Sequence, residues 1–539
     1  MANVLNMVDT AKAEYYCLNG ERAKGLEIYK TLIEELEGVD RTTAISNFIK
    51  HAFDEALALA KEDKWIEALD LYRAVMTYPD YPLNTYKNVG LCMKAIKNYK
   101  IALTFFQLYE KDATDKYEAY INLGDIYYKG LDDMKTAITY YEKALELNPN
   151  EYSIWNMLGH LYSTYYRESH EEEQIKYLRG AYKLNPTDRV VVKNLAYVLG
   201  KFDHVEEADK LYEELKGLQP LNSDLHSYGA YLVRHGRFEE GFDYLRYRFK
   251  KEDLKNCVFP DMFFGKKGWK PGKKVNKKSV LLHSEQGFGD TIMFSRYALV
   301  LKDKCNSVTL AVQPALERLF RIANLGVNVI TASEANEEDY DCIIPMMDLP
   351  LVCHTNTNNI PLAEGYLNIP QTYIDEFKKK YIGDNKKFRI GIAFEGSASS
   401  VETLRDIPLK ELYPLMQLPN VQVYCFQVGE LTGQIPKVPK SYSFTPLGDK
   451  FTDWLDTAAA MKSMDLMVTT DNGVMNLAGS LGVKTFGLFN SITEWRWFKT
   501  TGEDIGWYKS IKPFKCKTHN DWEPVIKQVL REVKEIVGE

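Results

Sequence analysis

The stretch EAYINLGDIYYKGLDDMKTAITYYEKALELNP, residues 118–149, decides the fold of the first half of this chain. Tyr120 and Gly124 fall on one face of a helix, and Ala137 and Tyr141 fall on one face of a second helix. The polar residues between the two patterns predict a turn, and the final proline cannot continue a helix. The segment is therefore expected to form a hairpin of two amphipathic helices.

The hairpin pattern recurs along the chain. A small residue returns with steps of 34, 35, 37 and 33 at Gly90, Gly124, Gly159, Ala196 and Gly229. This segment resembles the tetratricopeptide repeat family over about residues 51–250, and residues 1–50 are interpreted as weaker hairpins of the same stack. The resemblance implies an all-α solenoid over 1–250 whose concave surface binds a protein partner or an acceptor. The 36 tyrosines of the chain are interpreted mainly as packing between helices rather than as a carbohydrate-binding surface.

Composition limits the classes of function. The formal charge of -7 and a pI of about 5.9 argue against bulk nucleic-acid binding. No basic N-terminal region precedes an apolar stretch, and no run of about 18 apolar residues occurs, so neither a signal peptide nor a membrane span is expected. Eight cysteines are scattered without a CxxC pair, which is typical of a cytoplasmic protein without a zinc site or a disulfide framework.

The second half changes to short apolar runs that alternate with helical patterns, which predicts a multidomain chain with parallel sheets. A Lys- and Gly-rich linker is expected at 251–278, a first Rossmann-like lobe at 279–380 and a second at 381–539. The predicted strands are 279–283, 307–312, 327–330, 340–345, 388–394, 421–426, 465–470 and 483–489. Ligands of such sheets bind beyond the carboxyl ends of the strands, so the cleft between the lobes is the expected site.

A glycine loop follows the first predicted strand, in the sequence HSEQGFGDTIMFSRY. Gln286, Gly287 and Gly289 allow a tight turn into the next helix, and Asp290 is expected at or near the N-cap, facing the cleft. Taken alone, the loop leaves two interpretations of Asp290 equally open: a helix cap or a functional carboxylate.

Two further strand ends carry polar residues. Arg405 follows the strand at 388–394 and is interpreted either as a bidentate clamp for phosphate or as a surface salt bridge. The strand at 465–470 is followed by Asp471, Asn472, Gly473 and Val474. Backbone amides at this helix start suit the diphosphate of a nucleotide sugar, whereas Asp471 would repel it and is assigned a capping or orienting role.

Together these segments resemble tetratricopeptide arrays fused to a heptosyltransferase-like glycosyltransferase of the GT-B fold, more distantly like O-linked N-acetylglucosamine transferases. The resemblance rests on the order and spacing of several loose motifs and covers most of the second half. They are GRFEEGFDYLRYRF (236–249), LLHSEQGFGDTIMFSRYALVL (281–301), AVQPALERLF (311–320), LRDIPL (404–409), TDWLDTAAAMKSMDLMVTTDNGVMNLAGSLGVKTFGLF (452–489) and TEWRWF (493–498).

The resemblance implies transfer of a hexosyl or heptosyl group from a nucleotide sugar to a hydroxyl of a glycan, a protein or another acceptor. Asp290 would act as general base in an inverting displacement that needs neither a metal nor a cofactor beyond the donor. Gln427 would lie near the donor, and Trp495 and Arg496 would either close over it or anchor their loop. The resemblance also implies that the final helix, at about 521–537, crosses back to the first lobe.

Two departures from the family's pattern keep an alternative open. Asn476 stands where the family usually has histidine, and Val428 follows Gln427 where many relatives have lysine. Asn476 can still donate a hydrogen bond to phosphate. The alternative is a non-catalytic repeat scaffold with a degenerate transferase module. A dinucleotide oxidoreductase is disfavoured because the loop GFGDTI lacks the third glycine of its fingerprint.

Overall fold

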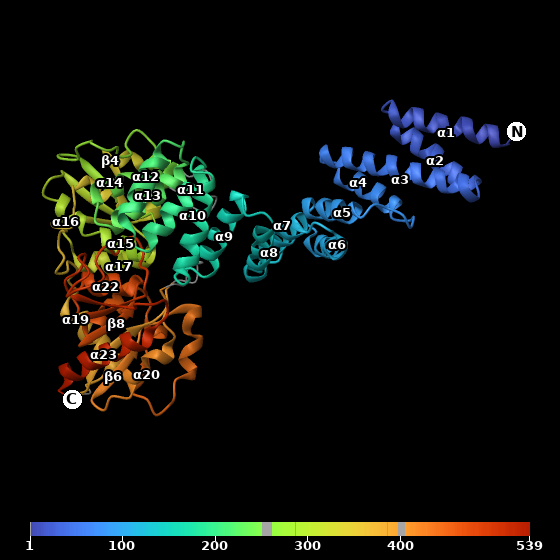
Figure 1. The fold of residues 1–539 in the computed structure, drawn as a ribbon. Helices are drawn as coiled ribbons and strands as arrows, with labels where there is room; N and C mark the ends of the chain where they lie inside the picture. Colours follow the sequence, from blue (N-terminus) through green and yellow to red (C-terminus); the bar gives the residue numbers. More distant parts are fainter. Residues whose placement is uncertain (1, 251–260, 286, 385, 397–404, 539) are drawn as a thin grey trace. The chain divides into compact units, whose positions relative to one another are not determined.

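The computed structural model describes residues 2–250, 261–285, 287–384, 386–396 and 405–538. Contacts divide the chain into two compact units, Met1–Asn194 and Leu195–Glu539. Helices fill the first unit, and the second unit begins with helices and continues with two sheets (Figure 1). The unit boundary lies inside a helix of the predicted repeat region rather than at the predicted linker, 251–278. The last repeat helices therefore belong to the same compact unit as the sheets.

The described part of the first unit is helical and holds no strand, in agreement with the predicted solenoid. Its helices are α1 (Ala2–Leu18), α2 (Arg22–Glu35), α3 (Gly38–Lys61), α4 (Trp65–Val75), α5 (Asn84–Ala95), α6 (Tyr99–Asp112), α7 (Tyr117–Asp125), α8 (Met134–Leu147), α9 (Tyr152–Tyr165), α10 (Glu171–Leu184) and the start of α11 (Arg189–Lys201).

The recurring glycine marks the point where the two helices of a hairpin meet. A Cβ atom on Gly124 would lie 3.0 Å from the ring of Tyr141, and one on Gly159 would lie 2.4 Å from Cγ of Leu178. Tyr141 is buried, and its hydroxyl donates a 2.8 Å hydrogen bond to Asp125. At Gly124, the ring of Tyr141 thus fills the space that the glycine opens between the two helices.

The second unit opens with the last repeat helices. They are α12 (Val205–Lys216), α13 (Asn222–Arg234) and α14 (Phe238–Leu245), followed by a 3₁₀ turn, η2 (Arg246–Lys250). Phe238 of α14 stacks on Trp507 with ring centroids 5.4 Å apart, and Phe242 meets Trp495 edge-on at 6.2 Å. Both phenylalanines are buried in the core that surrounds the first sheet.

The first sheet is parallel, with the order β3-β2-β1-β4. Its strands are β1 (Ser279–His283), β2 (Ser307–Val312), β3 (Asn328–Thr331) and β4 (Cys342–Pro345), and its helices are α15 (Phe288–Phe294), α16 (Tyr297–Leu301), α17 (Pro314–Ala323) and α18 (Leu349–Val352). The chain builds outward from β1 and then returns to its other side, so the strand order reverses between β1 and β4. This sheet and its helices are called the first lobe.

The second sheet is also parallel, with the order β10-β9-β8-β5-β6-β7 and a reversal between β5 and β8. Its strands are β5 (Phe388–Ala393), β6 (Val421–Cys425), β7 (Phe444–Pro446), β8 (Leu466–Thr470), β9 (Thr485–Phe489) and β10 (Ile511–Lys515). The remaining helices are α19 (Gln371–Phe377), α20 (Tyr413–Met416), α21 (Trp454–Lys462), α22 (Gly473–Ser480) and α23 (Trp522–Val537). The sheet, with α20 to α23, is called the second lobe.

The expectation that the final helix crosses back to the first lobe is wrong. α23 lies on the second lobe, near β6 and α20 (Figure 1), where Val525, Val529 and Val533 join the core of that lobe. The connection from β9 to β10, residues 490–510, reaches the first lobe instead. It carries Trp507, whose carbonyl accepts a 2.8 Å hydrogen bond from Arg296.

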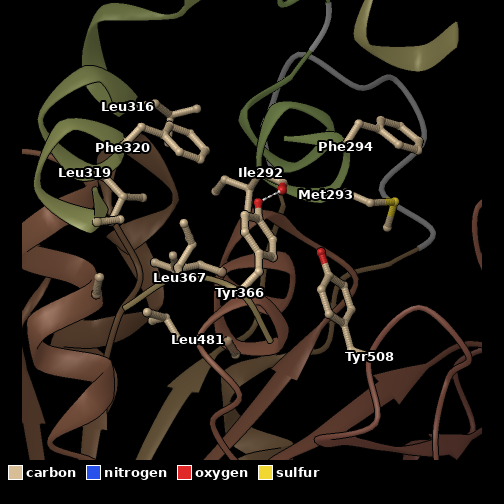
Figure 2. Close-up of a cluster of buried hydrophobic side chains, with 14 of the residues drawn as sticks. Ile292, Met293, Phe294, Leu316, Leu319, Phe320, Tyr366, Leu367, Leu481 and Tyr508 are labelled. Carbon is tan, nitrogen blue, oxygen red and sulfur yellow. Dashed lines mark hydrogen bonds between the residues drawn. The ribbon is translucent and has the colours of Figure 1, made fainter. Parts of the chain in front are cut away.

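The two lobes share an apolar junction. Figure 2 shows side chains of α15 and α17 gathered above Tyr366, Leu367, Leu481 and Tyr508. The hydroxyl of Tyr366 donates to the carbonyl of Ile292 in α15, and the amides of Tyr366 and Leu367 donate to the carbonyl of Ser480 at 2.7 and 2.8 Å. Since the junction is both apolar and hydrogen-bonded, it fixes the ends of the two sheets against each other.

We predict that Gly159→Ala loosens the hairpin of α9 and α10. Alanine favours a helix by up to about 1 kcal/mol over glycine, but overpacking against Leu178 costs about 1–3 kcal/mol. Hydrogen exchange should therefore become faster in peptides from both helices.

Gly217→Ala is the control, because a Cβ there would meet only the Glu214 carbonyl at an ordinary 3.4 Å. Unchanged exchange in α9 and α10 of Gly159→Ala would show that the close approach does not hold the hairpin.

Candidate functional site

Asp290 lies beyond the carboxyl end of β1, at the point where the first sheet reverses its strand order. Gly287 occupies the N-cap of α15 with an extended backbone, and Asp290 is the third residue of the helix. The N-cap expected at or near Asp290 is therefore the glycine. The carboxylate of Asp290 accepts a 2.6 Å hydrogen bond from Nε of Arg496, and its side chain is only 13% exposed.

Arg496 comes from the β9–β10 connection and joins the two lobes. A second nitrogen, Nη1, lies 3.3 Å from Glu494, and the guanidinium lies 4.3 Å from the centre of the Trp495 ring. Burial alone would lower the pKa of Arg496, but the carboxylates of Asp290, Glu494 and Asp471 raise it above its ordinary value. Arg496 therefore remains a cation held between carboxylates.

The start of α22 follows β8 at the reversal point of the second sheet. Asn472 is the N-cap, and its Oδ1 accepts a 3.1 Å hydrogen bond from the amide of Met475. The amides of Gly473 and Val474 precede the first intrahelical bond and find no acceptor among the described residues. This helix start thus offers two donors and the positive end of a helix dipole.

Asp471 is buried beside this helix start. Its Oδ2 lies 3.9 Å from Nη1 of Arg405, and the side chain is 9% exposed. Burial raises the pKa of Asp471 to about 6, with Arg405 opposing the shift and Glu494 adding to it. Arg405 thus lies within salt-bridge distance of Asp471.

Gln427 connects two strand ends inside the second lobe. Its Oε1 accepts from the amides of Phe394 and Glu395 at 3.3 and 3.1 Å, and its Nε2 donates to the Glu395 carbonyl at 3.4 Å. The carboxylate of Glu395 is bonded in turn by Gln434, and burial raises its pKa. Gln427 thus holds the loop after β5 in place from a buried position.

Two glycines, Gly289 and Gly473, lie where helices α15 and α22 contact each other. A Cβ on Gly289 would lie 3.0 Å from Nδ2 of Asn476 and 3.5 Å from Cα of Gly473. Asn476 is buried, its Nδ2 donates to the Asn472 carbonyl at 3.3 Å, and its Oδ1 accepts from Tyr508 at 3.2 Å. Both ends of the Asn476 amide are therefore engaged within the protein.

A buried ion cluster behind the glycine loop was missed in the sequence interpretation. Arg248 contacts Glu285 at 2.8 and 2.9 Å and Asp348 at 2.8 Å, and Arg246 also binds Asp348. The Glu285 carboxylate also accepts from the amide of Met347 at 3.0 Å. Burial raises the pKa of Glu285 even though Arg248 opposes it. The arginines at positions 246 and 248 of the segment YLRYRF were the feature of the sequence that could have indicated this cluster.

Three further residues were predicted at the site: Gln286, Val474 and Trp495. Gln286 lies outside the described residues. Val474 and Trp495 are partly buried against the apolar core. Among the described residues, no three His, Cys, Asp or Glu side chains are grouped so as to hold a metal ion. The site therefore consists of carboxylates, guanidinium groups and free helix amides.

Comparisons with known proteins support the repeats. Tetratricopeptide repeat models match residues 117–151 and 140–176. The chain thus contains tetratricopeptide repeats, which confirms the prediction from the period. It is 21% identical over 513 residues to Protein FlbA of Caulobacter vibrioides, which covers 90% of this chain and 84% of that protein. It is 28% identical over 85 residues to the transcription factor tau 131 kDa subunit of Saccharomyces cerevisiae, covering 16% of this chain and 8% of that protein.

Solved structures similar to the chain include YrrB and MamA. YrrB, described as a TPR protein with an unusual peptide-binding site, is 18% identical with a TM-score of 0.31 and covers 37% of this chain and 97% of its own. MamA AMB-1 is 19% identical with a TM-score of 0.28 and covers 32% and 91%. Separately, none of the helices in the described residues combines the length and apolar character needed to span a membrane.

We predict that Asp471→Asn stabilises the second unit more at high pH than at low pH. The pKa is raised by folding from 3.8 to about 6, so the charged form is disfavoured in the fold and stability is lost as pH rises through this range. With about 1.36 kcal/mol per pKa unit, the gain should grow from about 1 kcal/mol at pH 4.5 to about 3 kcal/mol at pH 7.5.

Thermal unfolding at the two pH values measures this difference. Glu523→Gln, at an exposed pair with Lys527 on α23, is the control and should change stability little. A gain from Asp471→Asn that is the same at both pH values would contradict the assignment.

Proposed function

We propose that the second unit is a glycosyltransferase of the GT-B type that uses a nucleotide-activated sugar. One observation carries the proposal: the loops at the reversal points of two parallel sheets meet. Asp290 comes from the first sheet, the start of α22 comes from the second, and Arg496 joins them. Open α/β sheets bind nucleotides at their reversal points. A general base on one side, Asp290, and an anion site on the other, the start of α22, suit transfer of a sugar from a nucleoside diphosphate.

The diphosphate of the donor would bind at the start of α22. The amides of Gly473 and Val474 supply hydrogen bonds, and the helix dipole favours the negative charge. Arg405 lies beside this position and is suited to bidentate contact with phosphate oxygens. Asp471 is more easily protonated than an exposed carboxylate because its pKa is about 6, which reduces its repulsion of the diphosphate.

Asp290 would take the proton from the acceptor hydroxyl. The hydroxyl oxygen then attacks the sugar carbon while the bond from that carbon to the diphosphate breaks, which inverts the carbon. The 2.6 Å hydrogen bond from Arg496 occupies an oxygen of the Asp290 carboxylate. We infer that the diphosphate draws Arg496 from Asp290, so that the arginine neutralises the leaving group while the carboxylate becomes available.

The tetratricopeptide repeats would bind the acceptor or a protein partner. Helical repeats stack into extended concave surfaces that suit such partners. We place the reaction in the cytoplasm, as expected from the scattered cysteines.

A non-catalytic scaffold is the second candidate. Two observations favour it: Asp290 is bonded to Arg496, and Asn476 uses both ends of its amide within the protein. In this alternative the charged site is a structural link between the lobes, and the chain binds no nucleotide sugar. Turnover of a nucleotide sugar by the parent chain separates the two candidates.

We predict that Asp290→Asn lowers transfer by about 10²- to 10⁴-fold with little change in donor affinity, because a general base contributes by that order. The amide oxygen can still accept the hydrogen bond from Arg496, so the fold should survive. Release of nucleoside diphosphate from a panel of UDP-, GDP- and ADP-sugars measures the rate, and thermal unfolding measures the fold.

Asp341→Asn is the matched control. Asp341 bonds the amide of Ser279 at 2.8 Å, at the opposite end of β1 from Asp290, and its loss should leave transfer unchanged. Asp290→Asn protein that melts normally and transfers sugar at the parent rate would exclude Asp290 as the base. A parent chain that turns over no donor in the panel would favour the scaffold.

A further inference from the structure

Arg296 places a positive charge inside the junction of the two lobes. Its side chain is fully buried. Nε donates to the carbonyl of Met293 at 2.9 Å, and Nη1 donates to the carbonyls of Pro361 and Trp507 at 3.2 and 2.8 Å. Among the described residues, Nη2 meets no hydrogen-bond acceptor. Because a guanidinium stays charged in a protein and a buried charge is costly, the groups around Arg296 must accommodate a cation.

Three aromatic rings surround this guanidinium. Its central carbon lies 4.5 Å from the centre of the Tyr508 ring, 5.6 Å from that of Trp507 and 5.8 Å from that of Tyr366. These distances are within the range of cation–π attraction. Tyr508 is itself fully buried. Burial raises the pKa of its hydroxyl although Arg296 opposes the rise, so the hydroxyl keeps its proton and can donate a hydrogen bond.

The hydroxyl of Tyr508 contacts helix α22. It donates to Oδ1 of Asn476 at 3.2 Å and accepts from Oγ of Ser480 at 3.4 Å. The ring of Tyr508 lies on α22 at Gly479, where a Cβ atom would overlap it. Close packing at this glycine therefore sets how far the hydroxyl reaches along α22, and it reaches Asn476.

The amide of Asn476 has one favourable orientation between its two partners. The carbonyl of Asn472 can only accept, so it must face Nδ2, which lies 3.3 Å away; Oδ1 then faces the hydroxyl of Tyr508. An amide nitrogen carries two N–H groups, and the second one has no acceptor among the described residues. A Cβ on Gly289 would lie 3.0 Å from Nδ2. One donor of Asn476 thus remains available where α15 and α22 meet.

We propose that Tyr508 is a positioning residue for the donor's diphosphate: its hydroxyl orients the amide of Asn476 so that the second N–H group donates to a phosphate oxygen. The inference rests on the proposed function, because it requires a diphosphate at the start of α22. Arg296 supports this arrangement by anchoring the segment that carries Tyr508 through the carbonyl of Trp507.

Calorimetric titration of the full chain with UDP, GDP and ADP tests the proposal. Tyr508→Phe keeps the ring and removes the hydroxyl, so the Asn476 amide is held at one end only. Affinity for the nucleotide that binds most tightly should fall by about threefold to tenfold. Asn476→Ala should weaken binding by about tenfold or more, the factor that a hydrogen bond to a charged group contributes. Tyr508→Phe added to Asn476→Ala should cause no further loss, because Tyr508 acts through that amide.

Tyr297→Phe is the matched control. Tyr297 is also fully buried in the second unit, but its hydroxyl donates to Thr355 at 2.8 Å rather than to α22. This change should lower the melting temperature without changing nucleotide affinity. Affinity of Tyr508→Phe equal to that of the parent, or a loss that persists in the Asn476→Ala background, would overturn the positioning role and leave the proposed donor site intact.

Crystals of the parent chain soaked with the same nucleotide give a second measurement that needs no variant. We expect a phosphate oxygen at about 3 Å from Nδ2 of Asn476. A diphosphate bound at the amides of Gly473 and Val474 but out of reach of Nδ2 would also overturn this inference alone. If the parent binds none of the three nucleotides at millimolar concentration, the proposed function is contradicted and the positioning role is overturned with it.

Discussion

The second unit depends on the close approach of two helix starts, α15 and α22. Both ends carry partial positive charge, so bringing them together is unfavourable unless negative groups accompany them. Asp290 in the first turn of α15 supplies that charge, while Gly289 and Gly473 remove the side chains that would keep the helices apart. Arg496 then balances the carboxylates of Asp290 and Glu494. The charged site is thus a consequence of how the two sheets are joined.

The connection from β9 to β10, residues 490–510, contacts both the charged site and the last repeat hairpin. Arg496 binds Asp290, and Trp507 stacks on Phe238 of the last repeat hairpin. The buried pair of Arg248 and Glu285 connects that hairpin to the glycine loop. Removing one partner of such a buried pair is strongly destabilising. The last repeat hairpin is therefore part of the second unit, which explains why the boundary between the two units precedes it.

The sequence predicted the regular elements well because their periods are local. The glycine of each hairpin and the strands that begin at Ser279, Ser307 and Phe388 follow from spacing alone. The strands β7 and β10 were missed, because both lie at edges of the second sheet, one with three residues and the other with Pro513 inside it. The bond between Asp290 and Arg496 joins residues 206 positions apart, and no local pattern encodes it.

Crystals of the chain soaked with millimolar UDP, GDP or ADP test the central claim, that the joined helix starts form a nucleotide-sugar site. The account predicts diphosphate density at the amides of Gly473 and Val474, with Arg405 beside it and Arg496 turned from Asp290 toward the phosphates. A helix start without density, with Arg496 still bonded to Asp290 at every nucleotide tried, would contradict the claim and leave the charged site as a structural link between two sheets.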